Sequence, residues 1–211
     1  MPVDKSLFFY GGIYHKLLDP HQAEAREVIA GFIPEGSSVL DIGCGTGQLC
    51  FALREKKQCR VVGIDLSIRM LRFAEKSNPY NEVTFVHQDA TDLSGFGDCT
   101  FDFATVLILM HELPREKQLC VLSEALRVAH KAIIVDASVP LPKNPSGLGV
   151  RFVEATFGRD HHGYFRNFLA TGGIMGLLHN SGLPITIAHR SAFWRNCREV
   201  VMVSRRKEEE S

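Results

Sequence analysis

Short apolar runs alternate along most of the chain with longer segments in which apolar residues recur at helical spacing. Runs rich in β-branched and aromatic residues predict strands, and a period of three to four residues predicts amphipathic helices. The predicted strands cover residues 38–42, 60–65, 83–89, 101–109 and 132–137. The predicted helices between them cover residues 48–56, 68–76 and 115–128. Such alternation is typical of parallel strands joined by crossover helices.

Acidic residues mark the ends of four of these predicted strands: Asp41, Asp65, Asp89 and Asp136. The first three recur at intervals of about two dozen residues, the length of one strand with its crossover helix, and the last interval is about twice as long. The near-continuous apolar runs in the fourth and fifth predicted strands indicate helices on both faces of the sheet. The pattern therefore predicts a doubly wound α/β sheet.

The regular alternation ends after the fifth predicted strand. Residues 137–170 begin with a Pro- and Gly-rich connection and continue with one or two short helices, which we interpret as an inserted cap. Residues 171–205 predict a last helix and then an antiparallel pair of strands at the sheet edge. Residues 1–36 predict N-terminal cap helices, and residues 37–136 the binding core. We expect a single domain, 1–211, with a Rossmann-like seven-stranded sheet, mostly parallel with its last strand antiparallel, plus a small helical cap.

Composition and charge narrow the class of protein. With 211 residues, 45% hydrophobic and 23% charged, the chain can bury one sizeable core. Lys and Arg number 24 and so do Asp and Glu, so no net charge would draw the protein to nucleic acid or anionic lipid. We therefore expect no nucleic-acid partner.

Two further features concern the cellular compartment. No apolar run reaches the length of a membrane span, and MPVDKSLFFYGG lacks the basic flank and long apolar stretch of a signal peptide. The 6 cysteines form no CxxC pair, a usage that suits reduced thiols inside a cell. We expect a cytoplasmic protein with no membrane span, no disulfide and no metal site.

A glycine-rich sequence, GCGTG, joins the first predicted strand to the following helix. This arrangement places backbone N–H groups and an open helix N-terminus at the carboxyl end of the sheet, where such folds bind ligands. The dinucleotide pattern G-x-G-x-x-G requires a third glycine where this chain has Gln48; the glycines are instead Gly43, Gly45 and Gly47. The loop thus departs from the NAD pattern.

The acids around this loop indicate a different ligand. A carboxylate at Asp41 suits a cationic amine better than a pyrophosphate. Asp65 can accept hydrogen bonds from the two hydroxyls of a ribose, and Asp89 from the exocyclic amine of an adenine, with the Ala90 N–H facing a ring nitrogen. Together these residues describe an aminoacyl-type cation, a ribose and an adenine.

In this order and spacing, LDIGCGTG, GIDLS, QDA and FDFATVLILMHEL resemble the class I S-adenosylmethionine-dependent methyltransferases over about residues 38–136. FFYGGIYHKLL and IRMLRFAEK resemble the methyltransferase-11 subgroup, which includes the ubiquinone and menaquinone biosynthesis methyltransferases. The Lys-Pro-Gly-Gly turn usual in that subgroup is replaced here by RVAHKA, so a quinone substrate is not carried over.

The resemblance implies S-adenosyl-L-methionine as cofactor and methyl transfer to a small-molecule acceptor, at carbon, oxygen or another nucleophile. It assigns the loop to the methionine part, the second acid to the ribose, and the residues after the second and third strands to the adenine. The cofactor-binding residues it implies are Tyr14, Asp41, Gly43, Cys44, Gly45, Gly47, Asp65, Leu66, Met70, Asp89, Ala90 and Leu107. Met70 is equally consistent with plain core packing, given its amphipathic helix.

His111 follows the fourth predicted strand, next to where a transferable methyl group would point, and is a candidate general base. The alternative is a histidine that caps the next helix or packs under the cap. His161 and His162 are adjacent and do not share a helix face, which argues against a metal site between them.

Two other function classes stay open at this point. One is an NAD(P)-dependent oxidoreductase on a related sheet, against which Gln48 and Asp41 argue. The other is an S-adenosylmethionine-binding module without catalysis. The sequence specifies neither the acceptor nor the oligomeric state.

Overall fold

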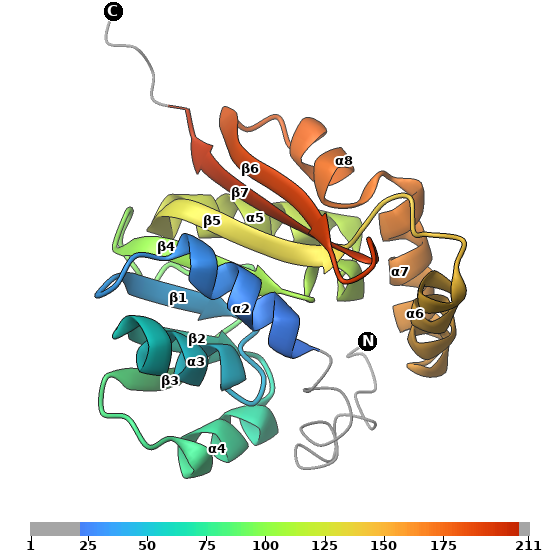
Figure 1. Ribbon diagram of the computed structural model, residues 1–211. Coiled ribbons are helices and arrows are strands. Elements are labelled where there is room, and N and C mark those ends of the chain that lie inside the picture. Colours follow the sequence, from blue (N-terminus) through green and yellow to red (C-terminus); the bar gives the residue numbers. More distant parts are fainter. Residues whose placement is uncertain (1–21, 207–211) are drawn as a thin grey trace, which may run out of the picture.

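A seven-stranded sheet runs through the computed structural model, which describes residues 22–206 (Figure 1). Its strands, in the spatial order β3-β2-β1-β4-β5-β7-β6, are β1 (Ser38–Ile42), β2 (Arg60–Asp65), β3 (Val83–His87), β4 (Phe101–Leu107), β5 (Ala129–Ala137), β6 (Ile185–Phe193) and β7 (Arg198–Arg205). β1 to β5 pair in parallel, while β7 is antiparallel to both β5 and β6. The predicted fold class is confirmed.

Helices cover both faces of this sheet. They are α2 (Ala23–Phe32), α3 (Gln48–Lys57), α4 (Ile68–Ser77), α5 (Arg115–Val128), α6 (Pro145–Thr156), α7 (Arg159–Ala170) and α8 (Gly173–His179), with a short 3-10 helix, η3 (Met110–Glu112). α2 and α3 lie on one face and α5 and α8 on the other, while α6 and α7 lie beyond the carboxyl ends of the central strands (Figure 1). The segment 137–170, interpreted as a cap, thus supplies two helices at the end of the sheet where its ligand loops gather.

Successive residues of one strand pack into two different hydrophobic cores. Leu40 packs into a core cluster with residues of α5 and α8, whereas its neighbour Val39 packs into a cluster with residues of α2 and α3. Ile134 and Ile133 divide in the same way. Because side chains alternate across a strand, a run that is apolar at every position needs cover on both faces. This requirement explains the near-continuous apolar runs.

Side-chain caps set where the helices around the carboxyl edge begin. The Ser67 hydroxyl accepts from the Met70 N–H at the start of α4, and the Asn144 side chain accepts from the Gly147 N–H at the start of α6. Each bond satisfies one of the backbone donors left free at a helix N-terminus. Short polar residues thereby fix the directions in which α4 and α6 leave the ligand edge.

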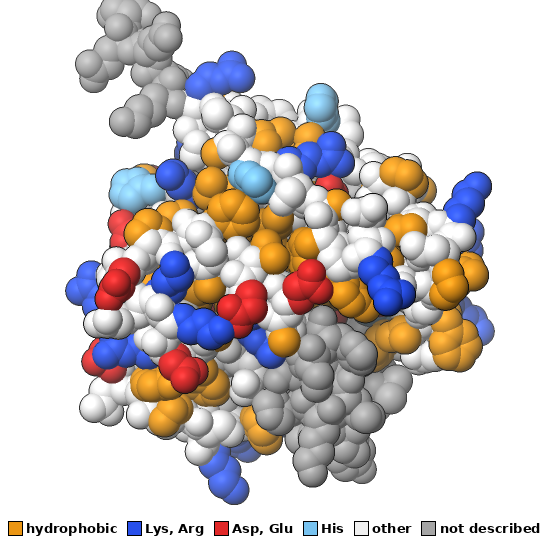
Figure 2. Space-filling model, viewed as in Figure 1, with side chains coloured by type: hydrophobic (Ala, Val, Ile, Leu, Met, Phe, Trp, Pro, Cys, Tyr) orange, Lys and Arg blue, Asp and Glu red, His pale blue; other side chains and the backbone are white. Residues whose placement is uncertain are grey.

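On the face shown in Figure 2, acidic and basic side chains of the described residues are interspersed. Within residues 22–206, no helix combines the length and apolar character needed to cross a membrane. Tyr14 and most of the predicted N-terminal cap, residues 1–21, lie outside the described residues.

Candidate functional site

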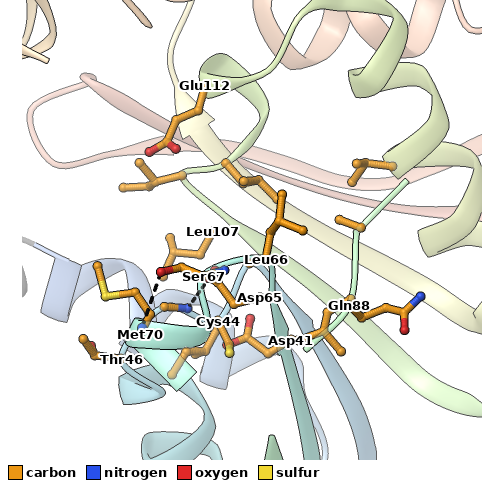
Figure 3. Close-up of a pocket in the computed structure, with 18 of the residues that line it drawn as sticks. Asp41, Cys44, Thr46, Asp65, Leu66, Ser67, Met70, Gln88, Leu107 and Glu112 are labelled. Carbon is orange, nitrogen blue, oxygen red and sulfur yellow. Dashed lines mark hydrogen bonds between the residues drawn. The ribbon is translucent and has the colours of Figure 1, made fainter. Parts of the chain in front are cut away.

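A cavity of about 140 Å³ lies at the carboxyl ends of β1, β2 and β4, next to the segment after β3 (Figure 3). Ten of the residues implied as cofactor-binding line it: Asp41, Gly43, Cys44, Gly45, Asp65, Leu66, Met70, Asp89, Ala90 and Leu107. In the close-up, Glu112 lies on the opposite side of the cavity from Asp41 and Cys44 (Figure 3). The structure therefore brings together residues that the sequence placed on four different loops.

The glycine loop presents its backbone to this cavity. The Gly45 N–H donates to Oδ2 of Asp65 over 2.9 Å, and the Gly43 N–H donates to the Ile64 carbonyl over 2.8 Å. A Cβ at Gly45, where φ is +53°, would meet no atom within 4 Å, so a ligand can approach the backbone closely there.

Gly47 differs from the other loop glycines and does not line the cavity. Its φ is +78°, and a Cβ there would lie 2.6 Å from Cζ of Phe85 on β3. The glycine at this position lets the start of α3 pack closely on the sheet, as the third glycine does in dinucleotide folds. Gly47 thus has a packing role, since the ring of Phe85 occupies the space on that side, and its implied cofactor contact stays a prediction.

Asp41 is the most enclosed acid of the cavity, with 2% of its surface exposed. The Thr105 hydroxyl donates to its Oδ1 over 2.8 Å, and the Cys50 thiol donates to its Oδ2 over 3.3 Å. Burial raises the pKa of Asp41 to about 6, against the lowering effect of these two hydrogen bonds. A cationic group bound in the cavity would restore the stability of the ionised carboxylate.

Sequence reasoning missed Thr105 and Cys50 as the partners of Asp41. Thr105 lies directly opposite Asp41 in the β1–β4 register, with the same side-chain direction. The hydroxyl of Thr105 within the apolar run FATVLIL was the signal that could have predicted this contact, because a buried hydroxyl requires a hydrogen-bond partner.

Asp65 holds the turn between β2 and α4. Its two carboxylate oxygens accept from the N–H groups of Gly45, over 2.9 Å, and Ser67, over 2.7 Å. Each oxygen keeps further lone-pair capacity, so the group can still accept from a pair of vicinal hydroxyls. The geometry fits the implied ribose contact, which stays a prediction.

The adenine-side residues have mixed local roles. Oδ1 of Asp89 accepts from the Thr91 N–H over 2.9 Å and from the Thr91 hydroxyl over 2.7 Å. Burial would raise the pKa of Asp89, but these bonds outweigh it and hold the pKa below its usual range. Leu66 is 53% exposed and Met70 only 3%. Met70 therefore serves both the core and the cavity wall.

A second cavity of about 320 Å³ adjoins the first and shares Gln22, Ile108 and Glu112 with it. It lies between η3 and the cap helices. Its remaining lining residues are His111, Ser146, Gly149, Val150, Val153, Glu154, Phe157, His161, Trp194 and Arg198. Ile108 adopts φ +55°, a conformation that is a genuine outlier for a β-branched residue, and strain of this kind clusters at ligand sites.

His111 is buried in the wall of this second cavity. Its Nδ1 lies 2.7 Å from Oδ1 of Asp136, and its Nε2 lies 3.4 Å from Oε2 of Glu154. Burial alone would lower the pKa of His111, but the two carboxylates outweigh it and raise the pKa to about 10. Burial would raise the pKa of Glu154, but hydrogen bonds from His111 and His161 outweigh it and hold the pKa well below its usual range. His111 thus packs under the cap and is oriented by Asp136.

Other residues of the cap line this cavity or support it. Nε2 of His161 lies 2.7 Å from Oε2 of Glu154, whereas His162 is not among the lining residues. Phe165 and Phe168 are buried against the His111 ring. Glu154 and Arg198 gave no signal in the sequence, because only the packing of the cap and of β7 brings them to this cavity.

Comparison with known proteins places the chain in a family. Residues 39–132 match the family described as "Methyltransferase domain". The chain is 30% identical over 180 residues to a cypemycin N-terminal methyltransferase from Streptomyces sp, an alignment that covers 81% of this chain and 71% of that protein. The chain belongs to the class I S-adenosylmethionine-dependent methyltransferases. The resemblance seen in the sequence is confirmed, and the oxidoreductase alternative is set aside.

Further relatives agree with this methyltransferase assignment. A demethylmenaquinone methyltransferase from Bacillus licheniformis is 32% identical over 136 residues, which are 60% of this chain and 57% of that protein. The chain spans about half the length of several curated relatives that it matches. The structure of a methyltransferase from Aquifex aeolicus superposes with a TM-score of 0.63 and 22% identity, covering 92% of this chain and 97% of that one, and shows the same fold. S-adenosylmethionine is the cofactor of this family.

Proposed function

We propose that this methyltransferase binds S-adenosylmethionine in the first cavity and transfers its methyl group to a small-molecule acceptor in the second. The observation that carries the proposal is the contact between the two cavities, which share Ile108 and Glu112. Ligands in the two cavities would meet at this shared wall. A methyl group and its acceptor have to be adjacent for direct transfer, and the two cavities satisfy that requirement.

Within the first cavity, the residues divide between the parts of the cofactor. Asp41 would hold the amine and Asp65 the ribose, while Leu66, Met70, Asp89 and Ala90 would surround the adenine. The loop glycines and the Leu107 backbone complete the methionine side, and Tyr14 would close over the cofactor. The open backbone at Gly45 and the buried acid at Asp41 both support this fit.

The bound cofactor supplies a methyl group on a positively charged sulfur. The chain itself has to align the acceptor with that methyl group and exclude water. Holding two reactants at near-attack distance contributes on the order of 7–11 kcal/mol, so alignment alone can account for much of the rate. Residues of α6, α7 and η3 line the second cavity, which supports this role for the cap.

His111 is the catalytic candidate at the acceptor site. Asp136 orients its ring, so Nε2 is the atom directed towards the second cavity. A hydroxyl or an enolisable carbon would require removal of a proton, for which a positioned base supplies roughly 10²–10⁴-fold. With its pKa raised to about 10, the His111 ring is already protonated in the ligand-free protein. It can therefore act as a base only if it loses its own proton when the acceptor binds.

The relatives support a small-molecule acceptor without selecting one. They are named for acceptors as different as demethylmenaquinone, erythromycin and the N-terminus of cypemycin. The second cavity combines apolar side chains such as Val150 and Phe157 with the charged Arg198 and Glu154. We propose an acceptor with an apolar body and one polar group, used in the cytoplasm, with no nucleic-acid partner.

Calorimetric titration tests the cofactor part of the proposal. We expect S-adenosylmethionine to bind the full chain with one site and NAD to show no saturable binding. Asp41→Ala should abolish the cofactor signal, whereas Asp98→Asn, on the exposed loop before β4, should leave it unchanged. Binding of NAD in preference to S-adenosylmethionine would overturn the proposal.

Transfer is tested separately with a cofactor labelled in its methyl group and a panel of phenols, thiols, hydroxy acids and amines. We expect label in at least one acceptor and none when Asp41→Ala replaces the native chain. Tight cofactor binding without transfer to any acceptor would favour the non-catalytic binding module instead.

A further inference from the structure

Three potential metal ligands converge in the wall of the second cavity. One ligand atom each from His111, Glu154 and His161 lies within 4.8 Å of the other two, and all three residues are buried. They come from η3, α6 and α7. Among residues 22–206, this is the group of three or more such side chains that could hold one ion. The sequence argument against a metal considered only His161 with its neighbour His162 and missed this convergence.

The spacing of these atoms is close to that of a metal site. Zinc bonds to nitrogen and carboxylate oxygen of 2.0–2.2 Å place tetrahedral ligands roughly 3.3 Å apart. Oε2 of Glu154 lies 3.4 Å from Nε2 of His111 and 2.7 Å from Nε2 of His161. The two histidine nitrogens lie within 4.8 Å of each other, so side-chain movements of about an ångström would bring the three atoms to coordination distance.

Asp136 supplies the outer support that metal-bound histidines usually have. Its Oδ1 lies 2.7 Å from Nδ1 of His111, which fixes the ring and directs Nε2 away from the carboxylate. Asp136 is itself fully buried and accepts from the N–H groups of His111 and Ala137. The chain thus holds one ligand rigidly before any ion arrives.

The second cavity leaves room for further ligands on the ion. Each of the three residues lines this cavity, so an ion between them would have open positions facing its interior. Three protein ligands with an open position are typical of catalytic rather than structural zinc sites. Two imidazoles and one carboxylate also suit ferrous iron, manganese and cobalt.

The charges around the site are compatible with a dication. Glu154 lies in the site as a carboxylate, Asp136 adds a second carboxylate on the far side of the His111 ring, and Arg198 lines the same cavity as a cation. Before metal binding, the Nε2 atoms of His161 and His111 both point at Oε2 of Glu154 as N–H groups, and both protons would leave on metal binding because the ligand is the bare nitrogen. Arg198 would remain available for an anionic part of the acceptor.

We propose that His111, Glu154 and His161 bind one divalent first-row transition metal ion, which coordinates an oxygen atom of the methyl acceptor. The second part rests on the proposed function. An acceptor hydroxyl on the ion would release its proton to solvent more readily, as metal-bound oxygens do. Its oxygen then forms the bond to the methyl carbon, while the carbon–sulfur bond breaks and its electron pair returns to sulfur, leaving a neutral thioether.

Metal binding alone tests the first part. The full chain is treated with chelator, dialysed, and titrated with Zn²⁺ by calorimetry and with Co²⁺ by visible absorption. We expect one equivalent of each, with cobalt bands typical of nitrogen and oxygen ligands. No stoichiometric binding would overturn the proposal, and so would a thiolate-to-cobalt band, which would report exposed cysteines such as Cys99 and Cys120 instead.

Matched variants locate the site. His161→Gln and Glu154→Gln should each weaken Zn²⁺ binding by more than about 100-fold, and Asp136→Asn by about 10–100-fold, the usual effect of losing outer support. His162→Gln, next to His161 but not lining the cavity, should bind as the native chain does. Circular dichroism verifies folding of each variant. Unchanged binding in a folded Glu154→Gln protein would overturn the assignment.

The two proposals fail in distinguishable ways. If S-adenosylmethionine binds and Zn²⁺ does not, the metal site is wrong and methyl transfer is untouched. If Zn²⁺ binds and S-adenosylmethionine does not, the proposed function fails while the site stands. Where both bind, chelator treatment should lower transfer to an oxygen acceptor at least tenfold, with activity restored by added metal; unchanged transfer would overturn the catalytic role of the ion.

Discussion

The hydroxyl of Thr105 donates to Oδ1 of Asp41 over 2.8 Å, across directly paired positions of β1 and β4. Despite this bond, burial raises the pKa of Asp41 from 3.8 to about 6. The folded protein therefore holds an ionised group in a place that favours the neutral form. We infer that Asp41 is maintained for a cationic ligand at the expense of stability, a trade-off common at functional sites.

Asp41→Asn should accordingly stabilise the cofactor-free protein at pH 7.5. The pKa of Asp41 is higher in the folded protein than in the unfolded chain. Its contribution to stability is therefore fully present below the unfolded pKa of about 4 and is lost as the pH rises through the folded pKa of about 6. The shift of about two units corresponds to at most about 3 kcal/mol, so we expect a gain of roughly 1–3 kcal/mol in the free energy of unfolding. Urea denaturation measures it.

The pH dependence supplies the control for this stability prediction. The difference between Asp41→Asn and the native chain should shrink towards zero at pH 4, where both forms are neutral. A gain of the same size at pH 4 and pH 7.5 would show that the substitution acts through packing and not through the charge.

Cofactor affinity should depend on the same ionisation. The amine of the cofactor needs the carboxylate form of Asp41. The negative charge of nearby Asp65 opposes the ionisation of Asp41 and so raises its pKa. We expect the dissociation constant to rise up to about tenfold for each pH unit below 6 and to level off above it. Calorimetry from pH 5 to 8 measures this profile. A flat profile in the native chain would exclude Asp41 as the partner of the amine.

The glycine loop allows a matched pair of substitutions. Gly47→Ala combines a left-handed backbone with a Cβ 2.6 Å from Phe85, so we expect a loss of roughly 2–4 kcal/mol in stability. Gly45→Ala meets no atom within 4 Å and should lose only about 1–2 kcal/mol from its backbone conformation. Its methyl group would instead occupy ligand space and weaken cofactor binding at least tenfold. Equal stability losses in the two variants would contradict these separate roles.

The central sheet could be predicted from the sequence because its signals are local. The apolar runs around Leu40 and Ile134 required cover on both faces, and the structure places successive residues in two separate cores. Ten of the twelve implied cofactor residues line one cavity, because carboxyl ends of parallel strands meet at one edge. Spacing along the chain was sufficient for these features.

The acceptor side could not be predicted in the same way. Glu154 and His161 lie on cap helices whose docking onto η3 depends on tertiary packing of Phe165 and Phe168 around His111. A lone Glu in FVEATF has no partner in its own element, so nothing local marks it as functional. Gly47 is the converse case, a residue that the local motif marks for binding. Only the position of Phe85 on another strand reveals its packing role.

His111→Ala separates the acceptor site from the cofactor site. Removal of the ring should leave the cofactor dissociation constant within about twofold, because His111 lines the second cavity and not the first. Turnover should fall by roughly 10²–10⁴-fold whether the ring acts on the acceptor proton directly or through a bound ion. Steady-state kinetics with the labelled cofactor and the best acceptor of the panel measures the effect. Near-native turnover at both acid and alkaline pH, in a folded variant, would remove His111 from the chemistry.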